Sequence, residues 1–254
     1  VIAIYSFNFE ITRIRGLINE PLAGQLRLKW WYDAIESIGT GKSSNHPVIS
    51  QIEQVIEEFQ IDPLLLLSLV EANAANLSPR QPDSVTEMLE QIDKTSGVLY
   101  RLLVNVVDSK GSDNAVSAGY HIARACEISR ILRSLASDAN TGINCLPRDI
   151  CRREGLATND INKLETSEPL EDKIIEVIRA VVDVGIDELL KGRGFRKDIN
   201  PLVRTVLLPA TLAGQDFKAL TAEGFDPRRM RPRPLEPGPF AMIKLWWNAR
   251  CGLY

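Results

Sequence analysis

Apolar residues recur at steps of three and four through nearly every segment of this chain. In the first segment, Ile4, Phe7, Ile11, Ile14 and Ile18 follow this spacing, which places their side chains on one face of a helix. No convincing alternating strand pattern, no Asn-Gly or Asp-Gly hairpin turn and no short-period repeat accompanies these helical segments. The sequence therefore predicts an all-α protein, with residues 1–254 forming one domain of about nine or ten helices.

Capping residues and prolines predict where several helices begin and end. Asp62 before Pro63 suits a capped helix start, and Ser84 with Glu87 has the spacing of a capping box. Pro209 predicts a kink or break within residues 201–225. We expect a long helix at residues 115–137, facing a helix at residues 3–17 across a central cavity.

Net charge and cysteine spacing argue against two kinds of ligand, nucleic acid and zinc. A net charge of −3 argues against broad nucleic-acid binding, which normally needs a basic face. No cysteine pair has CxxC spacing, so we expect ordinary thiols in a reducing compartment and no zinc site. No apolar run approaches the roughly 20 residues that cross a bilayer. We expect a cytoplasmic protein, with peripheral contact to the inner membrane face left open.

Two aromatic pairs and one basic run are candidate contact surfaces. Trp30 and Trp31 are expected in the core, although one of them could line a cavity or a partner surface. Near the end of the chain, a short apolar helix could lie at a membrane interface or dock on the domain. The basic run before it could attract lipid phosphates or form a solvated connector. The candidates for membrane or partner contact are Arg228, Arg229, Trp246 and Trp247.

Four segments together resemble the squalene/phytoene synthase family. They are "AIYSFNFEITRI", "PLAGQLRLKWWYDAIESI", "EISRILRSLASDANTGINCLPRDI" and "VRTVLLPATLA", and they occur in the expected order over nearly the whole chain. The resemblance implies the isoprenoid-synthase fold, an all-α bundle around a central cavity. Active members join two prenyl diphosphates head to head. Two aspartate-rich motifs hold magnesium against the diphosphates, because metal ions must neutralise the leaving group.

This chain departs from the family at those motifs. The two aspartates of the first motif fall at Thr12 and Gly16, and a further family aspartate falls at Asn76. In the second motif the aspartates fall at Ser134 and Asp138, four residues apart and therefore on one helical face. At most one motif aspartate, Asp138, therefore remains as a metal-ligand candidate. The alternatives for Asp138 are a turn cap or a salt-bridged interior with Arg130 and Arg133.

Other polar residues are candidates for the cavity wall. Glu10 and Asn8 could replace the lost ligands, but an internal ion pair of Glu10 with Arg13, Arg27 or Arg130 is the preferred interpretation. Ser134 is a weak candidate nucleophile, since no histidine base is placed beside it by the sequence. The full set of cavity candidates is Asn8, Glu10, Arg27, Asn76, Glu127, Arg130, Ser134 and Asp138.

Two function classes remain open. The pattern "SFNFEI" followed by "EPLAGQLRLKWWYDAI" most resembles a divergent branch of the family that includes a mitochondrial complex I assembly factor. This resemblance implies a non-catalytic protein that binds a lipid or prenyl tail or assists assembly of a membrane complex, without a cofactor. The alternative is an active prenyltransferase that makes squalene or phytoene and uses magnesium.

Overall fold

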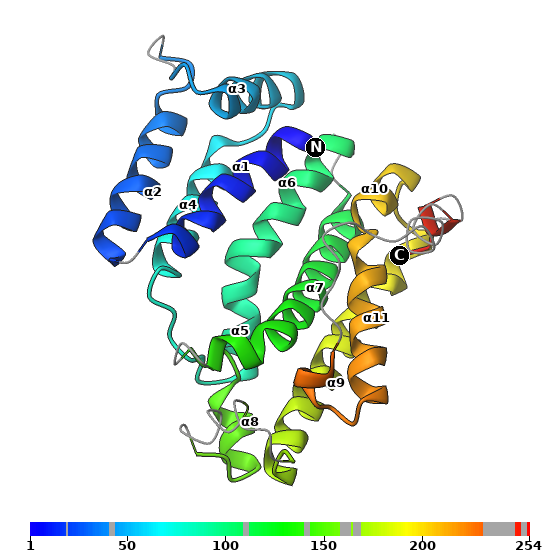
Figure 1. Ribbon diagram of the computed structural model, residues 1–254. Helices are drawn as coiled ribbons and strands as arrows, with labels where there is room; N and C mark the ends of the chain where they lie inside the picture. Colours follow the sequence, from blue (N-terminus) through cyan, green and yellow to red (C-terminus); the bar gives the residue numbers. More distant parts are fainter. Residues whose placement is uncertain are drawn as a thin grey trace.

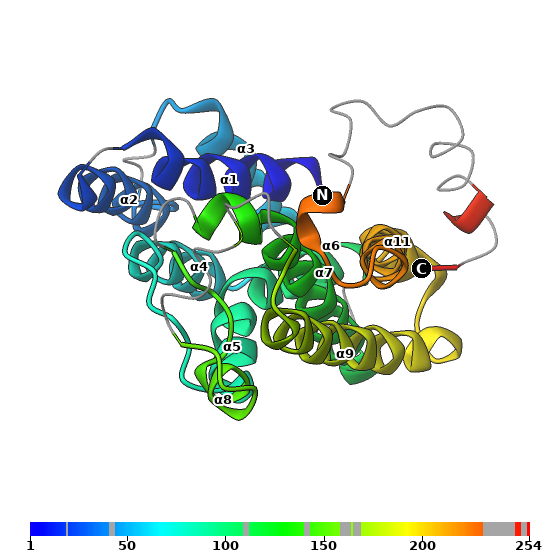
Figure 2. The same ribbon diagram turned by 60° about the horizontal axis from the view of Figure 1, so that its bottom comes forward.

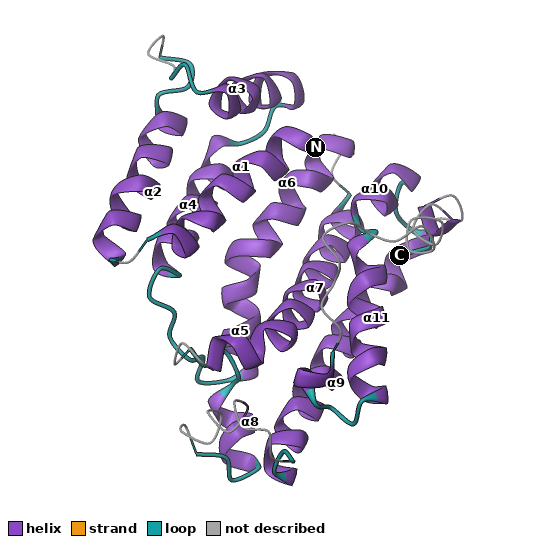
Figure 3. Cartoon of the chain, in the orientation of Figure 1, coloured by secondary structure: helices purple, strands orange, loops and turns teal. Residues whose placement is uncertain are grey.

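The computed structural model describes residues 1–18, 20–40, 44–108, 112–139, 143–157, 164, 169–230, 247–249 and 253–254. Within these residues the chain consists of helices and loops without a strand (Figure 3), so the all-α prediction is confirmed. None of the described helices is both long and apolar enough to cross a membrane. The helices are α1 (Ile2–Thr12), α2 (Pro21–Glu36), α3 (Pro47–Phe59), α4 (Pro63–Ala75), α5 (Val85–Ile92), α6 (Val98–Val107), α7 (Asp113–Ala139), α8 (Arg148–Arg153), α9 (Asp172–Gly194), α10 (Pro201–Val206) and α11 (Pro209–Ala222).

Local sequence signals fix several of these boundaries. The Asp62 side chain accepts a hydrogen bond from the Leu64 N–H at 2.9 Å, and Ser84 Oγ accepts one from the Glu87 N–H at 3.2 Å. These bonds satisfy N–H groups that have no partner in the first turn of a helix. Pro209 is the first residue of α11 and separates it from α10. The predicted caps and the predicted break are therefore confirmed.

Two expected helices are less regular than the periodicity predicts. The first gives way to a 3-10 helix, η1, at Arg13–Leu17. A single π turn, η2, at Asp93–Gly97 joins α5 to α6. Gly97 lies at the end of this turn, where an added Cβ would come within 2.7 Å of the Tyr120 ring on α7. The absence of a side chain at Gly97 therefore lets Tyr120 of α7 pack closely against the end of the π turn.

The long helix α7 organises the molecule (Figure 1). It packs most extensively against α9 and also contacts α6 and α11. On the other side of α6 lie α4, α2 and α1, as both ribbon views show (Figures 1 and 2). Fully buried side chains such as Phe7 on α1, Leu102 on α6 and Phe217 on α11 belong to one continuous core. This arrangement leaves clefts beside α7 and between α1 and α2.

The two tryptophans of α2 have different environments, which corrects the expectation that both lie in the core. Trp31 is 5% exposed and packs edge-to-face on Phe7, with ring centroids 5.7 Å apart. Trp30 is 44% exposed and packs against Trp31 and His46. Adjacent residues of a helix point about 100° apart, so only one of the two tryptophans can face the protein core.

Candidate functional site

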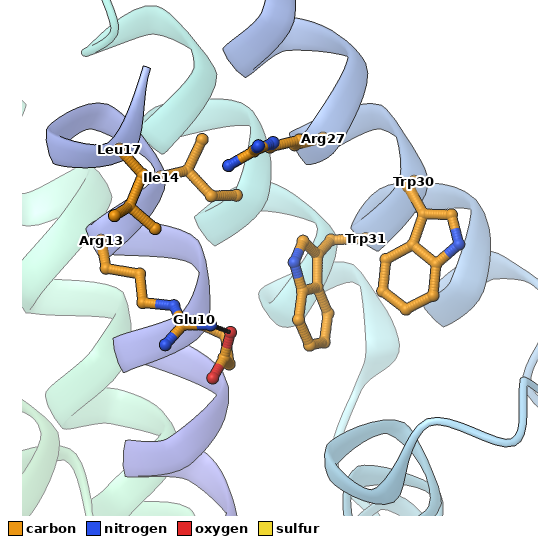
Figure 4. A pocket seen from close by; sticks show the side chains of 7 residues that line it. All are labelled: Glu10, Arg13, Ile14, Leu17, Arg27, Trp30 and Trp31. Atoms are coloured by element: carbon orange, nitrogen blue, oxygen red, sulfur yellow. Dashed lines mark ion pairs between the residues drawn. The ribbon is translucent and has the colours of Figure 1, made fainter.

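The cleft between α2 and the first segment, formed by the end of α1 and by η1, contains two of the predicted polar residues, Glu10 and Arg27 (Figure 4). Its volume is about 450 Å³ when the space open to solvent is included. Figure 4 shows Arg27 and Trp31 projecting from α2 toward α1. Glu10 forms an ion pair with Arg13, three residues further along the chain, with Oε2 of Glu10 2.8 Å from Nη2 of Arg13. The expected ion pair of Glu10 is present with Arg13 as the partner, but it is not internal, because the Arg13 side chain is 47% exposed. The lining residues are Glu10, Arg13, Ile14, Leu17, Arg27, Trp30 and Trp31.

A larger cleft, which we call the main cleft, lies between η1, α4, the α5–η2 region and α7. It encloses about 1080 Å³, part of which is open to solvent. Arg15 comes from η1, whereas Glu127 and Arg130 come from α7. The first segment and the long helix therefore face each other across this space, as the sequence predicts. Asn76, at the end of α4, also lines it.

A third cleft, of about 660 Å³ with the space open to solvent included, lies on the side of α7 that faces α11. Ser134, Arg133 and Arg130 line it together with Pro209 and Leu212. Arg130 is shared with the main cleft. Four of the predicted residues are thus brought together around the C-terminal half of α7 and the end of α4: Asn76, Glu127, Arg130 and Ser134.

The positions of the first family motif carry no metal ligand. Thr12 is exposed, and its hydroxyl donates a hydrogen bond to the Asn8 carbonyl oxygen at 2.8 Å. Gly16 is exposed, and an added Cβ there would meet no atom within 4 Å. Asn8 is half-buried on α1 and lines none of the three clefts described above.

A hydrogen bond within α7 joins the two aspartate positions of the second family motif. Ser134 Oγ donates to Asp138 Oδ2 at 2.6 Å, which confirms that the two side chains share one face of α7. In the turn that follows, the Asp138 backbone carbonyl accepts a hydrogen bond from the Ile143 N–H at 3.0 Å. Residues 140–142, on which the expected side-chain cap depends, lie outside the described residues, so that cap stays a prediction.

The arginines of α7 have partners that differ from the expected ones. Arg130 pairs with Glu127 at 2.6 Å, and the Glu127 carboxylate also accepts a hydrogen bond from Ser96 Oγ at 3.2 Å. Arg133 pairs with Asp216 of α11 at 3.0 Å, and Asp216 further accepts from Ser129 Oγ at 2.5 Å. The predicted salt-bridged interior exists, but Asp216 is its acidic centre. The sequence did not single out this residue, because it lies 83 positions from Arg133.

This donor set does not fit a magnesium–diphosphate cluster. Magnesium bound to diphosphate needs carboxylate oxygens that converge from different helices. Here the carboxylates of Glu10, Glu127 and Asp138 each bond a cation or hydroxyl that lies only three or four residues away along the chain. Among the residues that the structure describes, no group of three or more His, Cys, Asp or Glu side chains is arranged to hold a metal ion.

The basic wall of the main cleft was missed by sequence reasoning. Arg15, Arg80 and Lys94 line this cleft in addition to Arg130. Arg15 immediately precedes Gly16, the position of a lost family aspartate, and this proximity was an available signal. Lys94 belongs to the π turn, and nothing in its local sequence marks it as a cleft residue.

The predicted contact surface near the end of the chain is described only in part. Arg228 pairs with Asp226 at 2.8 Å and Arg229 pairs with the same carboxylate at 3.3 Å. Trp246 lies outside the described residues, whereas the Trp247 side chain is 58% exposed. The neighbouring Asn248 donates a hydrogen bond to Thr211 of α11 at 3.1 Å. The described end of the chain thus contacts α11 while Trp247 faces solvent.

Comparison with solved structures places this geometry in a known fold. A dehydrosqualene synthase crystallised with a ligand superposes with a TM-score of 0.82 at 14% identity, covering 98% of this chain and 84% of that protein. The squalene synthase HpnC of Alicyclobacillus acidocaldarius gives a TM-score of 0.79 at 15% identity, covering 89% and 83% of the two chains. The fold is therefore that of the isoprenoid synthases, as expected from the resemblance.

Sequence relatives come from two groups. A mouse protein named NADH dehydrogenase (ubiquinone) complex I, assembly factor 6 is 22% identical over 177 residues, which cover 69% of this chain and 52% of the relative. The chain thus spans about half the length of this relative. A homologue of that factor in Drosophila melanogaster is 25% identical over 236 residues, covering 88% of this chain and 67% of the relative.

The second group of relatives is represented by a protein that is named as an enzyme. A phytoene synthase of Cereibacter sphaeroides is 27% identical over 131 residues, covering 50% of this chain and 36% of the relative. The sequence profile of the squalene/phytoene synthase family matches residues 1–236. Because this match extends over nearly all of the sequence, the chain belongs to the squalene/phytoene synthase family.

Proposed function

We propose that this protein is a non-catalytic member of its family that acts as a binding module in the assembly of a membrane complex of the NADH dehydrogenase type. The observation that carries the proposal is the loss of free carboxylates at both family motifs. On α7, Glu127 pairs with Arg130, and Asp138 accepts a hydrogen bond from Ser134. In the first motif, Thr12 and Gly16 stand in place of the two aspartates. The similarity to complex I assembly factor 6 proteins supports the same conclusion.

The size of the catalytic deficit favours this proposal over an active prenyltransferase. A metal ion contributes several kcal/mol of transition-state charge stabilisation when it neutralises a leaving group. Each ~1.4 kcal/mol that is lost lowers the rate about tenfold. Since three of the four motif aspartates are replaced by Thr12, Gly16 and Ser134, almost no turnover is expected from the remaining carboxylate.

Exposed apolar side chains on the first two helices provide a surface for a partner. Ile2, Tyr5 and Phe9 recur at steps of three and four on α1, and Phe9 is 59% exposed. On α2 an apolar stripe at steps of four comprises Leu22 (63% exposed), Leu26 (65%) and Trp30. Contiguous apolar surface of this kind marks interaction sites in proteins that are otherwise well packed.

Charge balance on these helices favours a protein partner over an anionic membrane. A polybasic excess would be expected at a surface that binds anionic lipid. Instead, Lys29 pairs with Asp33 at 2.6 Å, and Arg13 pairs with Glu10. Residues 1–36 contain equal numbers of both charges, namely the basic Arg13, Arg15, Arg27 and Lys29 and the acidic Glu10, Glu20, Asp33 and Glu36. We therefore infer that the partner is a protein subunit of the complex.

An incubation with prenyl diphosphates tests whether catalysis is absent. Purified protein with magnesium and farnesyl or geranylgeranyl diphosphate should release no pyrophosphate and form no squalene or phytoene above the blank. A bacterial phytoene synthase serves as the positive control. Turnover that disappears in Asp138→Ala and Glu10→Ala variants would overturn the proposal, because it would demonstrate a rebuilt catalytic site.

A genetic experiment tests the assembly role. Deletion of the gene in its own host should lower the amount of intact NADH dehydrogenase on native gels, and the wild-type gene should restore it. The Leu22→Ser/Leu26→Ser variant should fail to restore it. Leu190→Ser is the matched control, because Leu190 is 60% exposed on α9, away from this surface. Normal NADH dehydrogenase levels in the deletion strain would contradict the assembly role.

A further inference from the structure

The cleft between α2 and the first segment contains one charged side chain that is not neutralised. Arg27 projects from α2 toward the first segment (Figure 4), and its guanidinium forms no ion pair or hydrogen bond with any residue that the structure describes. The other two charged residues of the lining, Arg13 and Glu10, pair with each other at 2.8 Å. The Arg13 guanidinium also lies over the Phe9 ring, 5.4 Å from its centroid. Arg27 can therefore bind an incoming anion without first breaking a salt bridge.

Exposed apolar side chains surround this charge. Trp30 lines the cleft, and Leu26 and Leu22 continue the same exposed row along α2 at steps of four. Leu17 of η1 is exposed on the opposite wall. At 1.5 Å per residue, the row from Leu22 to Trp30 is about 12 Å long. An occupant that fits must therefore be apolar over about two helical turns and carry a negative group beside Arg27.

The helical walls of the cleft favour a helix as the occupant. The backbone groups in the middle of α2 bond within their own helix, so this wall offers no free strand edge to an extended peptide. An extended peptide would also leave its own N–H and C=O groups without partners against apolar side chains. A helix satisfies these groups internally, and its side chains recur at steps of three and four that match the row on α2.

A second copy of this chain is a poor occupant. The apolar row is centred on Leu26, next to Arg27, so a two-fold pairing of two such rows would bring the two Arg27 side chains close together. Like charges that meet in an interface destabilise it. Asp33, the carboxylate of α2 nearest to Arg27 in sequence, already pairs with Lys29 at 2.6 Å and does not relieve this repulsion.

We propose that the cleft between α2 and the first segment binds an amphipathic α-helix of a partner protein, in which a central Asp or Glu pairs with Arg27. The proposal rests on the proposed function, because it specifies how the partner of this surface is recognised. Apolar side chains of the partner helix cover Leu22, Leu26 and Trp30. An apolar cover alone would bury an unpaired charge, which is costly, whereas the planar guanidinium of arginine matches a carboxylate. The carboxylate therefore selects the partner and sets its register in the cleft.

Site-specific photo-crosslinking in the protein's own host identifies the occupant. p-Benzoylphenylalanine in place of Leu26 should crosslink to a partner segment, whereas the same photo-reactive residue in place of Leu190 on α9 should not. Mass spectrometry of the crosslinked peptide should show apolar residues at steps of three and four around an Asp or Glu. A synthetic peptide of that sequence should bind the purified protein in fluorescence anisotropy titrations and gain helical circular dichroism on binding.

An exchange of charges tests the role of Arg27. Arg27→Glu should weaken binding of this peptide at least about tenfold, as expected for a lost charge-assisted hydrogen bond. Its melting temperature should stay unchanged, because Arg27 is exposed. Replacement of the peptide's carboxylate by lysine should restore binding to Arg27→Glu and weaken binding to the wild type. Arg101→Glu is the matched control and should bind like the wild type, since Arg101 is exposed on α6 and lines none of the three clefts.

The proposal is wrong if no segment crosslinks at position 26, or if the captured segment comes from a second copy of this chain, lacks a carboxylate or binds without becoming helical. Equal peptide affinity of Arg27→Glu and the wild type would also overturn it. The assembly role is tested separately. Normal NADH dehydrogenase levels in the deletion strain contradict that role but leave a successful charge exchange standing. Lowered levels together with a failed charge exchange contradict only the helix in this cleft.

Discussion

Glu188 on α9 is a buried carboxylate that three cationic or titratable side chains surround. Its Oε2 lies 2.7 Å from His121 Nδ1 and 3.1 Å from Arg124 Nη1, and Lys191 contacts Oε1 at 3.1 Å. Arg124 in turn bonds Asp93 of the π turn at 2.7 Å. Burial alone would raise the pKa of Glu188, but the hydrogen bonds from His121, Lys191 and Arg124 lower it to about 2. This network of ion pairs and hydrogen bonds links α7, α9 and η2.

The lowered pKa of Glu188 predicts how stability depends on pH. The ordinary value is 4.5, so the stabilisation is fully present above pH 4.5 and is lost as the pH falls toward 2. A lowering of this size corresponds to roughly 3 kcal/mol. We expect Glu188→Gln to reduce the free energy of unfolding by about 2–3 kcal/mol at pH 7 in urea titrations, with a smaller difference from wild type at pH 4.

Asp187→Asn is the control for this prediction. The Asp187 side chain is 62% exposed and pairs only at the surface with Lys191, so its loss should change stability by less than about 1 kcal/mol. If the difference between Glu188→Gln and wild type were the same at pH 7 and pH 4, the ionised carboxylate would not be the stabilising species.

At the scale of elements, the packing of α7 against α9 depends on glycines that let the helices approach. An added Cβ on Gly185 would come within 2.5 Å of the Phe217 ring of α11 and within 3.0 Å of Ile128 on α7. Gly192 is similarly close to Ile122, at 2.5 Å. Because Phe217 and both isoleucines are buried, they have little space into which they can move. Close packing therefore requires the absence of a side chain at these positions.

Gly185→Ala should therefore destabilise the protein, although alanine is the better helix former. Overpacking of this kind costs about 1–3 kcal/mol, more than the gain of up to about 1 kcal/mol in helix propensity. Gly194→Ala on the same helix is the matched control, since its added Cβ would meet no atom within 4 Å. Thermal unfolding should show a lower melting temperature for Gly185→Ala only. An unchanged value in that variant would show that α7, α9 and α11 can separate without cost.

At the scale of the whole molecule, one core connects the first and last large helices. Phe7 of α1 and Phe217 of α11 belong to the same continuous set of buried side chains, with α6 and α7 between them. We expect one cooperative unfolding transition, because the buried apolar side chains in the described part of the chain form a single cluster. Tryptophan fluorescence reports on α2 through Trp30 and Trp31 and on the end of the chain through Trp246 and Trp247. It should give the same midpoint as far-ultraviolet circular dichroism. Two distinct midpoints would divide the chain into separate folding units.

The sequence determined the features that depend on neighbours along the chain. Helical periodicity predicted the all-α class, Asp62 and Ser84 predicted helix starts, and Pro209 predicted a break. The spacing of Ser134 and Asp138 was sufficient to place them on one face of α7. These predictions succeeded because caps, turns and the 3.6-residue repeat are local properties of the backbone.

The tertiary structure alone decided which distant residues meet. Arg133 pairs with Asp216, Arg15 and Lys94 line one cleft, and Trp30 faces solvent while Trp31 is buried. Each of these facts depends on how helices far apart in the sequence pack and rotate relative to one another. Periodicity shows that a helix has a buried face, but it does not identify the helix that covers that face, so the charge of the main cleft became visible only in the folded chain.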